Sequence, residues 1–202
     1  IYNFVDVQRF HRKPIDAFRK VIAPGGERIL LHASNFRKIK RVEDVVKIFY
    51  QVKKSIPSKL LFVGDGPERT TAEELSRDLG VCDDMRFVGK QEQMEDILAI
   101  ADLFLLTSEY ESFGLAALEA MAAGVPVIST NAGGLSEINV NGVTGYMGNV
   151  GDVETMSRCA IEILSDDRTL NQFKENAAAQ ARRFDINNIV PLYEKLYEKF
   201  LI

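Results

Sequence analysis

The sequence predicts an α/β fold, a doubly wound (Rossmann-like) parallel sheet of about six strands followed by C-terminal helices. Two observations support this. Short apolar runs alternate with stretches of helical periodicity along most of the chain. The runs are apolar at almost every position, as in strands covered on both faces of a parallel sheet. The expected strands are Ile29–Ala33, Leu60–Val63, Arg86–Val88, Leu103–Leu106, Val127–Ser129 and Gly145–Met147.

Helical patterns fill the intervals between these strands. After the first strand, apolar residues recur every three or four positions, at Val42, Val45, Val46, Phe49 and Val52. The helices expected in later intervals are Thr70–Leu79, Gln93–Ala101 and Leu115–Ala123. Gly80 and Gly124 follow the first and last of these, where a glycine commonly ends a helix.

After Gly151 the strands stop, and the pattern predicts three helices, Asp152–Leu164, Arg168–Arg182 and Asn188–Phe200. Asp152 and Asp166 are the expected N-terminal caps of the first two. The last helix carries a broad apolar stripe. We expect this stripe to pack against the same domain; the alternative is that it helps to dock a second domain.

The composition is that of an ordinary globular protein. Of 202 residues, 46% are hydrophobic and 27% charged, which suffices for a full core. The net charge of -4 argues against a general nucleic-acid binder, because a phosphate backbone needs a broad basic surface. The two cysteines, Cys82 and Cys159, lack a metal-like spacing and indicate free thiols in a reducing compartment, the cytoplasm. No apolar run approaches the roughly 18 residues of a membrane span.

A basic run follows the first expected strand. Its sequence is Ser34-Asn35-Phe36-Arg37-Lys38-Ile39-Lys40-Arg41, with four cations in five positions. Exposed basic runs are usually solvated surface. This one follows a strand end in an acidic protein, directly before a helix, where α/β sheets hold ligands. We therefore expect it to bind an anion.

Glycine turns follow three further strands. The turn at 64–68, Gly-Asp-Gly-Pro-Glu, either uses glycine at positive φ or lets the backbone of Gly66 approach a ligand, and these interpretations are compatible. Gly89-Lys90 would let backbone groups meet a flat base, with the Lys90 stem against it. The turn at 131–137 enters a short helix and contacts a sugar or phosphate, or only closes the wall of the cleft.

Two glutamates frame the loop after the fourth strand. Glu111 precedes a Ser112-Phe113-Gly114 turn, and Glu119 lies within the helix that starts at Leu115. The free N–H groups and positive dipole end of that helix suit a phosphate or diphosphate. Glu119 lies one turn further along, roughly 6 Å from Leu115, where it can accept hydrogen bonds from a ribose diol. Otherwise it is an ordinary surface carboxylate.

The two histidines offer no convincing base. His32 falls within an expected buried strand, and we expect a satisfied core residue rather than a catalyst. No Ser-His-Asp set, Walker loop, metal cluster or G-x-G-x-x-G motif is visible. The residues point to nucleotide-sugar binding, and neither a metal nor another cofactor is expected.

The segment from Ser108 to Glu119 resembles the E-x7-E signature of the retaining glycosyltransferase family 4, which has the GT-B architecture. The glycine turns at 64–68, 87–89 and 133–137 fall where that family has them, and Tyr2–Asp6 is similar to its interdomain connection. The resemblance covers essentially the whole chain. It implies that residues 1–202 form one half of a GT-B fold, the C-terminal donor-binding domain, and that an acceptor domain precedes Ile1.

The resemblance also implies roles for single residues. Lys40 resembles the lysine that grips the donor diphosphate, Glu111 the carboxylate that faces the transferred sugar, and Glu119 the one that binds the ribose. Backbone groups of the turn entering the helix would hold the phosphates. The other positions expected at the donor site are Gly66, Lys90, Ser112, Phe113, Gly114 and Leu115.

One departure concerns the second cation. Where the family has an arginine five residues before its lysine, this chain has Asn35, and we expect Arg37 or Lys38 to supply the charge. The Ser-Asn-Phe-Arg…Lys-Arg variant is similar to that of a subgroup, the N-acetylglucosaminyl-L-malate synthases of bacillithiol biosynthesis.

These features predict the donor-binding half of a retaining glycosyltransferase that binds UDP-GlcNAc or UDP. In the full enzyme it would transfer GlcNAc to L-malate, which would contact mostly the other domain; the fragment alone is expected to be inactive, and a homo-oligomer is left open. The alternatives are a family 4 enzyme with another donor or acceptor, a GT-B-fold nucleotide-sugar epimerase, and a non-catalytic nucleotide-sugar-binding module. A dinucleotide-dependent oxidoreductase is disfavoured because no G-x-G-x-x-G follows the first strand.

Overall fold

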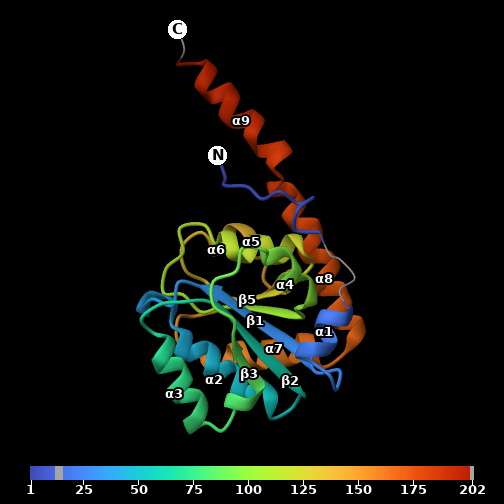
Figure 1. The fold of residues 1–202 in the computed structure, drawn as a ribbon. Helices are drawn as coiled ribbons and strands as arrows, with labels where there is room; N and C mark the ends of the chain where they lie inside the picture. The colour runs from blue at the N-terminus through green and yellow to red at the C-terminus, as the bar shows by residue number, and fades with distance from the viewer. Residues whose placement is uncertain (12–15, 201–202) are drawn as a thin grey trace.

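The computed structural model describes residues 1–11 and 16–200. All of the expected strands are present, and their ends lie within about two residues of the predicted ones, the usual uncertainty of such boundaries. The strands are β1 Arg28–Ser34, β2 Ser58–Gly64, β3 Met85–Phe87, β4 Leu103–Leu106, β5 Val127–Thr130 and β6 Gly145–Gly148. They form one six-stranded sheet in the order β3-β2-β1-β4-β5-β6, parallel throughout (Figure 1). The predicted doubly wound class is confirmed.

The strand order reverses between β1 and β4. From β1 the chain builds outward through β2 and β3 and then returns to the other side of β1, where Leu30 lies opposite Leu103. The loops that leave two strands at such a switch point run in opposite directions and leave a crevice between them. The carboxyl ends of β1 and β4 are therefore the place where this fold favours a ligand.

Helices cover both faces of the sheet. Their bounds are α1 Asp16–Ile22, α2 Val42–Lys53, α3 Arg69–Asp78, α4 Met94–Ile100, α5 Leu115–Ala122, α6 Leu135–Ile138, α7 Val153–Leu164, α8 Asp167–Ala181 and α9 Ile186–Glu198. Helices α4 and α5 lie on one face of the sheet, and α2, α3 and α7 lie on the other (Figure 1). Within the described residues, no helix is both long enough and apolar enough to cross a membrane.

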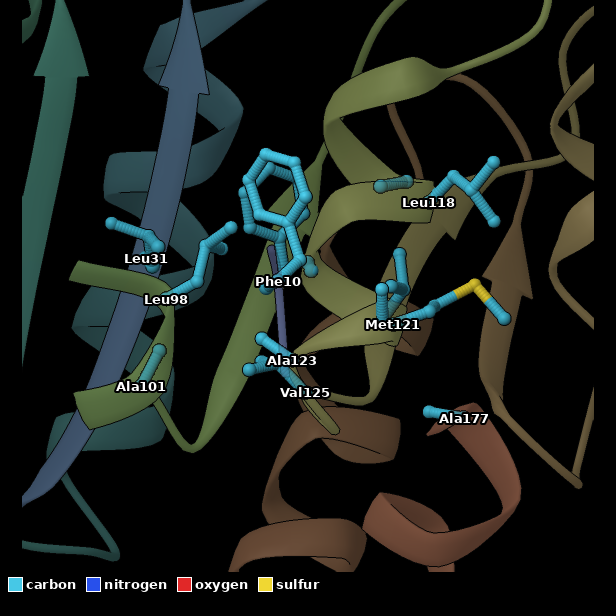
Figure 2. Packing of buried hydrophobic residues seen from close by; sticks show 14 of the residues in the cluster. Phe10, Leu31, Leu98, Ala101, Leu118, Met121, Ala123, Val125 and Ala177 are labelled. Carbon is cyan, nitrogen blue, oxygen red and sulfur yellow. The ribbon is translucent and has the colours of Figure 1, made fainter. Parts of the chain in front are cut away.

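Each face of the sheet has its own hydrophobic core, and successive residues of β1 alternate between them. Leu31 packs in the core beneath α4 and α5, whereas Leu30 packs in the core beneath α2 and α7. Figure 2 shows the first core, where Leu118 and Met121 of α5 point inward next to small residues of neighbouring segments. Because α5 is buried along this face, its N-terminal end is held firmly at the carboxyl edge of the sheet.

Several short elements were not predicted, among them helix α1 and the first of the 3-10 helices. Helix α1 mixes charged and apolar residues, and its buried residue is Ile22, so the sequence shows no periodic stripe. A 3-10 helix, η1, spans Lys38–Lys40 within the basic run. A single turn of three residues is too short to produce a periodic signal.

The last helix, α9, does not pack along the domain as expected. It projects away from the sheet, and the N-terminal segment lies beside its first turns (Figure 1). Among the described residues of α9, Ile189 is the buried one, while Leu192 and Tyr197 are 45% and 62% exposed. A bridge between Val5 and Asp185 ties the N-terminal segment to the start of α9. The periodicity identified the helix, but periodicity does not tell which surface covers an apolar stripe.

Candidate functional site

A pocket of about 320 Å³ opens at the carboxyl ends of β1 and β4, at the switch point of the sheet. The end of β1, the loop before α5 and the N-terminal segment enclose it. Larger hollows exist, including one of about 730 Å³ beside α8, but the pocket at the switch point is the one that gathers residues predicted from the sequence. Its lining residues are Asn3, Ala33, Ser34, Asn35, Lys40, Leu106, Glu111, Ser112, Phe113, Gly114, Leu115 and Ala116.

Lys40 and Glu111 form an ion pair in this pocket. The ammonium Nζ lies 2.5 Å from Oε1 of the carboxylate. The side chains are only 19% and 13% exposed, so water screens the pair less than it screens a surface pair. The same oxygen accepts a second hydrogen bond, at 2.7 Å, from the hydroxyl of Ser108. The structure therefore brings the two residues expected to face the diphosphate and the sugar into direct contact.

Hydrogen bonds fasten the loop that carries Lys40 to the loop that carries Glu111. The hydroxyl of Thr107 donates to the carbonyls of Lys40 and Arg41, at 2.9 and 3.0 Å. The backbone N–H of Glu109 donates to the carbonyl of Ile39 at 2.8 Å. These loops leave the neighbouring strands β1 and β4, and the contacts hold the two loops together.

The buried side chain of Phe36 anchors the basic run to the hydrophobic core. It is fully buried although its φ is +39°, an uncommon value for a residue with a side chain. Its ring lies edge-on to Phe62 at 5.6 Å and to Phe87 at 6.4 Å. The buried ring holds the loop against the sheet, and the residues that follow it turn outward.

The cations of the basic run have different surroundings. Arg41 is held by Asp44 at 2.6 Å and by Glu109 at 3.1 Å; the hydrogen bond that it donates to Asp44 is the main reason why the pKa of Arg41 is raised. Arg37 and Lys38 are exposed and make no ion pair with any residue in the described ranges. Neither lines the pocket, so their expected role as a substitute cation depends on rotation of long side chains toward it.

The N-terminus of α5 faces the same pocket. Its cap is Gly114, with φ at +91°, and no side chain caps the free N–H groups. No acidic residue occupies the first turn. The left-handed backbone favours glycine at position 114, and a Cβ there would also have to displace the end of the Leu135 side chain, 2.5 Å away. An uncapped helix end beside a lysine is a suitable place for an anionic group.

The turn at Gly133-Gly134 supports the loop that carries Glu111. A Cβ at position 133 would lie 2.0 Å from the carbonyl oxygen of Glu111, and one at 134 would lie 2.4 Å from that of Ser112. The N–H of Gly134 donates to the carbonyl of Glu111 at 2.8 Å. The short helix predicted after this turn is present as α6. The two glycines therefore let this turn pack directly against the backbone of the loop that carries Glu111, and in this sense the turn is a brace for the site.

Glu119 lies one turn further along α5 and does not line the pocket. It is partly buried, and this burial raises the pKa of its carboxyl group; the charge of Arg9 opposes the shift and that of Glu95 adds to it. No hydrogen bond to its side chain occurs among the described residues. A half-buried carboxylate with free acceptor capacity beside the pocket is compatible with a bound hydroxyl pair.

Gly66 and Lys90 also lie outside the pocket. Gly66 packs against the first loop, and a Cβ there would lie 2.0 Å from the carbonyl oxygen of Asn35. The structure thus gives Gly66 a clear packing reason, while Lys90 is exposed on the loop after β3. Neither residue's expected contact with a ligand is tested by this geometry.

His32 is a satisfied core residue, as expected. Its Nδ1 lies 2.9 Å from the carbonyl of Leu105, and its Nε2 lies 2.8 Å from Oγ of Ser34. A carbonyl can only accept, so Nδ1 carries the proton and the hydroxyl of Ser34 donates to Nε2. Burial lowers the pKa of His32 to about 4, which keeps the ring neutral.

Sequence reasoning did not single out three polar residues of the site. Ser34 and Asn3 line the pocket, and Ser108 holds Glu111. Ser34 ends a strand, a position that is itself a signal in an α/β fold. Asn3 offers no such signal, because only the tertiary fold brings the N-terminal segment to the sheet. Within residues 1–11 and 16–200, no group of three or more His, Cys, Asp or Glu side chains is arranged to hold a metal ion.

Residues 15–180 match the protein family described as glycosyl transferases group 1. The chain belongs to this family. A curated relative, N-acetyl-alpha-D-glucosaminyl L-malate synthase of Bacillus anthracis, is 42% identical over 199 residues, which cover 98% of this chain and 52% of the relative. Glycogen synthase of Mycobacterium tuberculosis is 32% identical over 93% of the chain and 44% of its own length. The predicted family resemblance is confirmed.

Solved structures of glycosyltransferases share the fold of this domain. HepE of Anabaena, in complex with UDP and glucose, has a TM-score of 0.87 and 25% identity, over 99% of this chain and 55% of HepE. Sucrose-phosphate synthase of Thermosynechococcus elongatus has a TM-score of 0.89 and 26% identity, over 98% of this chain and 51% of the synthase. The fold is that of GT-B glycosyltransferases. The chain spans about half the length of these relatives.

Proposed function

We propose that residues 1–202 form the donor-binding domain of a retaining, family 4 glycosyltransferase that uses UDP-GlcNAc and, within the whole enzyme, transfers GlcNAc to L-malate. The observation that carries the proposal is the ion pair of Lys40 and Glu111 beside the uncapped N-terminus of α5. A cation, a carboxylate and free backbone N–H groups meet in one pocket. These are the groups needed to hold a diphosphate next to a sugar.

The chemical demand of the reaction is to stabilise the negative charge that develops on the departing UDP. Lys40, Phe113, Gly114 and Leu115 line the pocket where that charge would lie, and the backbone N–H groups of the last three would bind it. Arg37 or Lys38 would add a second cation from the exposed part of the basic run. Glu111 would orient the sugar and stabilise positive charge near its anomeric carbon.

The nucleoside would extend away from this centre along α5. In this arrangement Glu119, one turn beyond the helix end, accepts hydrogen bonds from the ribose diol. The loop of Gly89 and Lys90 would meet the base. The donor would then run from the sugar at Glu111, across the diphosphate at Lys40, to the nucleoside near Glu119.

The choice of donor and acceptor draws support from one relative. The 42% identical protein from Bacillus anthracis is named for GlcNAc and L-malate, and HepE was solved with UDP and glucose. This suggests UDP-GlcNAc as the donor, an L-malate acceptor held mainly by a further domain, and a place in bacillithiol biosynthesis. The free thiols of Cys82 and Cys159 suit a reducing compartment, so we place the reaction in the cytoplasm.

A ligand panel tests the donor assignment. UDP-GlcNAc should raise the melting temperature of the chain more than ADP-glucose, GDP-mannose or NAD, because binding to the folded state stabilises it. Preference for another nucleotide sugar would show that the enzyme is a family member that uses a different donor. Failure of a folded sample to bind any uridine nucleotide would refute the donor-domain assignment.

An activity assay tests the division of labour between domains. The 202-residue polypeptide should bind UDP-GlcNAc weakly, because domain closure normally completes such sites. With L-malate present it should release no UDP above background. Robust GlcNAc transfer by these residues alone would contradict the two-domain proposal, whereas steady conversion of UDP-GlcNAc to an epimer without acceptor would favour an epimerase.

A further inference from the structure

The two carboxylate oxygens of Glu111 have different surroundings. Oε1 accepts both the ammonium of Lys40, at 2.5 Å, and the hydroxyl of Ser108, at 2.7 Å. Oε2 makes no hydrogen bond within the described residues, yet it is not among their buried unpaired atoms. It therefore remains accessible. One oxygen is anchored to the protein, and the other is free to meet a ligand.

Ser108 is the rigid member of this trio. Its side chain is completely buried, directly after β4. Its own carbonyl accepts a hydrogen bond of 2.6 Å from the hydroxyl of Thr130, on the neighbouring strand β5. The side chain of Lys40, by contrast, is a flexible four-carbon chain and is partly exposed.

We infer that Ser108 is a positioning residue that keeps Glu111 in place when a donor diphosphate draws Lys40 away. The inference rests on the proposed function. A diphosphate carries more negative charge than one carboxylate, and it attracts the ammonium of Lys40 strongly. Ser108 is uncharged and buried, so it keeps its bond to Oε1. The free oxygen, Oε2, then stays directed at the sugar.

The inference predicts that loss of Ser108 weakens binding of the GlcNAc group but not of the nucleotide, and a binding experiment can test this. Calorimetry on the 202-residue chain compares UDP-GlcNAc with UDP for the wild type and for Ser108→Ala. We expect the variant to bind UDP-GlcNAc about five to ten times more weakly, the loss expected for one hydrogen bond, because Glu111 is no longer aimed at the sugar. UDP lacks the GlcNAc that Glu111 would orient, so its affinity should change less than about twofold.

A double-mutant cycle with Glu111→Ala tests whether Ser108 acts through Glu111. In the Glu111→Ala background, Ser108→Ala should cause no further loss of UDP-GlcNAc affinity, since there is no carboxylate left to position. An equal additional loss in that background would overturn the inference. A purely structural role of Ser108 would give additive losses of this kind.

Two further variants separate positioning from stability. Ser58→Ala removes another buried serine hydroxyl, at the opposite end of the sheet, and should leave the ratio of the two affinities unchanged. Ser108→Cys fills a similar space with a much weaker donor and covers the case in which Ser108→Ala does not fold. It should show the same sugar-specific loss, and a wild-type affinity ratio would overturn the inference.

The outcomes also distinguish the inference from the proposed function. If the wild type binds UDP-GlcNAc and UDP, but Ser108→Ala weakens both equally, the positioning role is wrong and the donor-domain proposal stands. If the folded wild type binds neither, the donor-domain proposal is wrong and the inference falls with it.

Discussion

The ammonium of Lys40 lies 2.5 Å from the carboxylate of Glu111, although the two residues are 71 positions apart and belong to different loops. Within the pocket each charge neutralises the other. An ammonium has three N–H donors, so Lys40 can turn toward phosphate oxygens without a large change of backbone. The pair is therefore suited to exchange partners when an anionic ligand arrives.

Replacement of Lys40 should weaken the binding of UDP but not that of uridine. In Lys40→Ala we expect a loss of roughly 1.5–3 kcal/mol in UDP binding, the range for a hydrogen bond to a charged group. The unpaired carboxylate of Glu111 would add repulsion toward the phosphates. Titration with UDP and with uridine measures the effect, and uridine should lose little because it lacks phosphates. Equal losses for both ligands would remove Lys40 from the diphosphate site.

Arg37 is the proposed substitute for the cation that is missing at Asn35. Because Arg37 is exposed and free of ion pairs in the described part of the chain, Arg37→Ala should leave the stability of the domain unchanged. Its UDP affinity should fall by about 1 kcal/mol or more if the guanidinium reaches the phosphates. The same titration on Lys38→Ala identifies which residue acts. If neither variant changes UDP affinity, the substitute cation is wrong.

Glu119 can be tested through the ribose alone. Glu119→Gln should weaken UDP relative to 2′,3′-dideoxy-UDP, since only UDP offers the diol. A neutral amide still accepts a hydrogen bond, so the expected loss is modest, about 1 kcal/mol per bond. Competition calorimetry with the two nucleotides measures the preference. An unchanged preference for the diol would return Glu119 to the role of an ordinary, half-buried carboxylate.

The buried ring of His32 predicts a pH dependence of stability. Its pKa is about 4 in the folded protein against 6.5 for the free side chain, because burial disfavours the charged form. Between these values the unfolded chain binds a proton that the folded chain does not. The contribution of neutral His32 to the free energy of unfolding is thus fully present above pH 6.5. It is lost as the pH falls toward 4, by about 3 kcal/mol in total.

Urea unfolding at several pH values checks this. His32→Asn keeps a donor for the carbonyl of Leu105 but cannot take up a proton, so its stability should fall less steeply between pH 6.5 and 4. Identical slopes for the wild type and His32→Asn would contradict the assignment.

The sequence predicted the sheet and most of the pocket because both follow from local signals. Apolar runs define buried strands, and polar residues in the loops that follow them, such as Lys40 and Glu111, are expected at one edge of a parallel sheet. Pairing between residues is not a local property. Arg41 belongs to the same basic run as Lys40, yet its left-handed backbone directs it to Asp44 and Glu109. The exposed stripe of α9 and the lining role of Asn3 likewise depend on tertiary contacts that periodicity does not contain.

Gly133 provides a test of how the fold supports the site. Its φ is +62°, and a Cβ would lie 2.0 Å from the carbonyl oxygen of Glu111. Gly80 has a similar φ, +68°, but a Cβ there would meet nothing within 4 Å. Gly80→Ala should therefore show the strain of a left-handed alanine alone, roughly 1–2 kcal/mol, and leave UDP-GlcNAc binding intact. Gly133→Ala should lose more stability than Gly80→Ala, because it adds a clash that costs about 1–3 kcal/mol.

The clash at position 133 should also reach the ligand. It pushes on the backbone of Glu111, so Gly133→Ala should weaken UDP-GlcNAc binding at temperatures where the domain is still folded. Urea unfolding gives the stability of both variants, and calorimetry well below the midpoint gives their affinities. If Gly133→Ala and Gly80→Ala lose the same stability and keep the same affinity, the glycine turn is not a brace for the site. A loss of affinity confined to Gly133→Ala would tie the geometry of Glu111 to a backbone contact that touches no ligand.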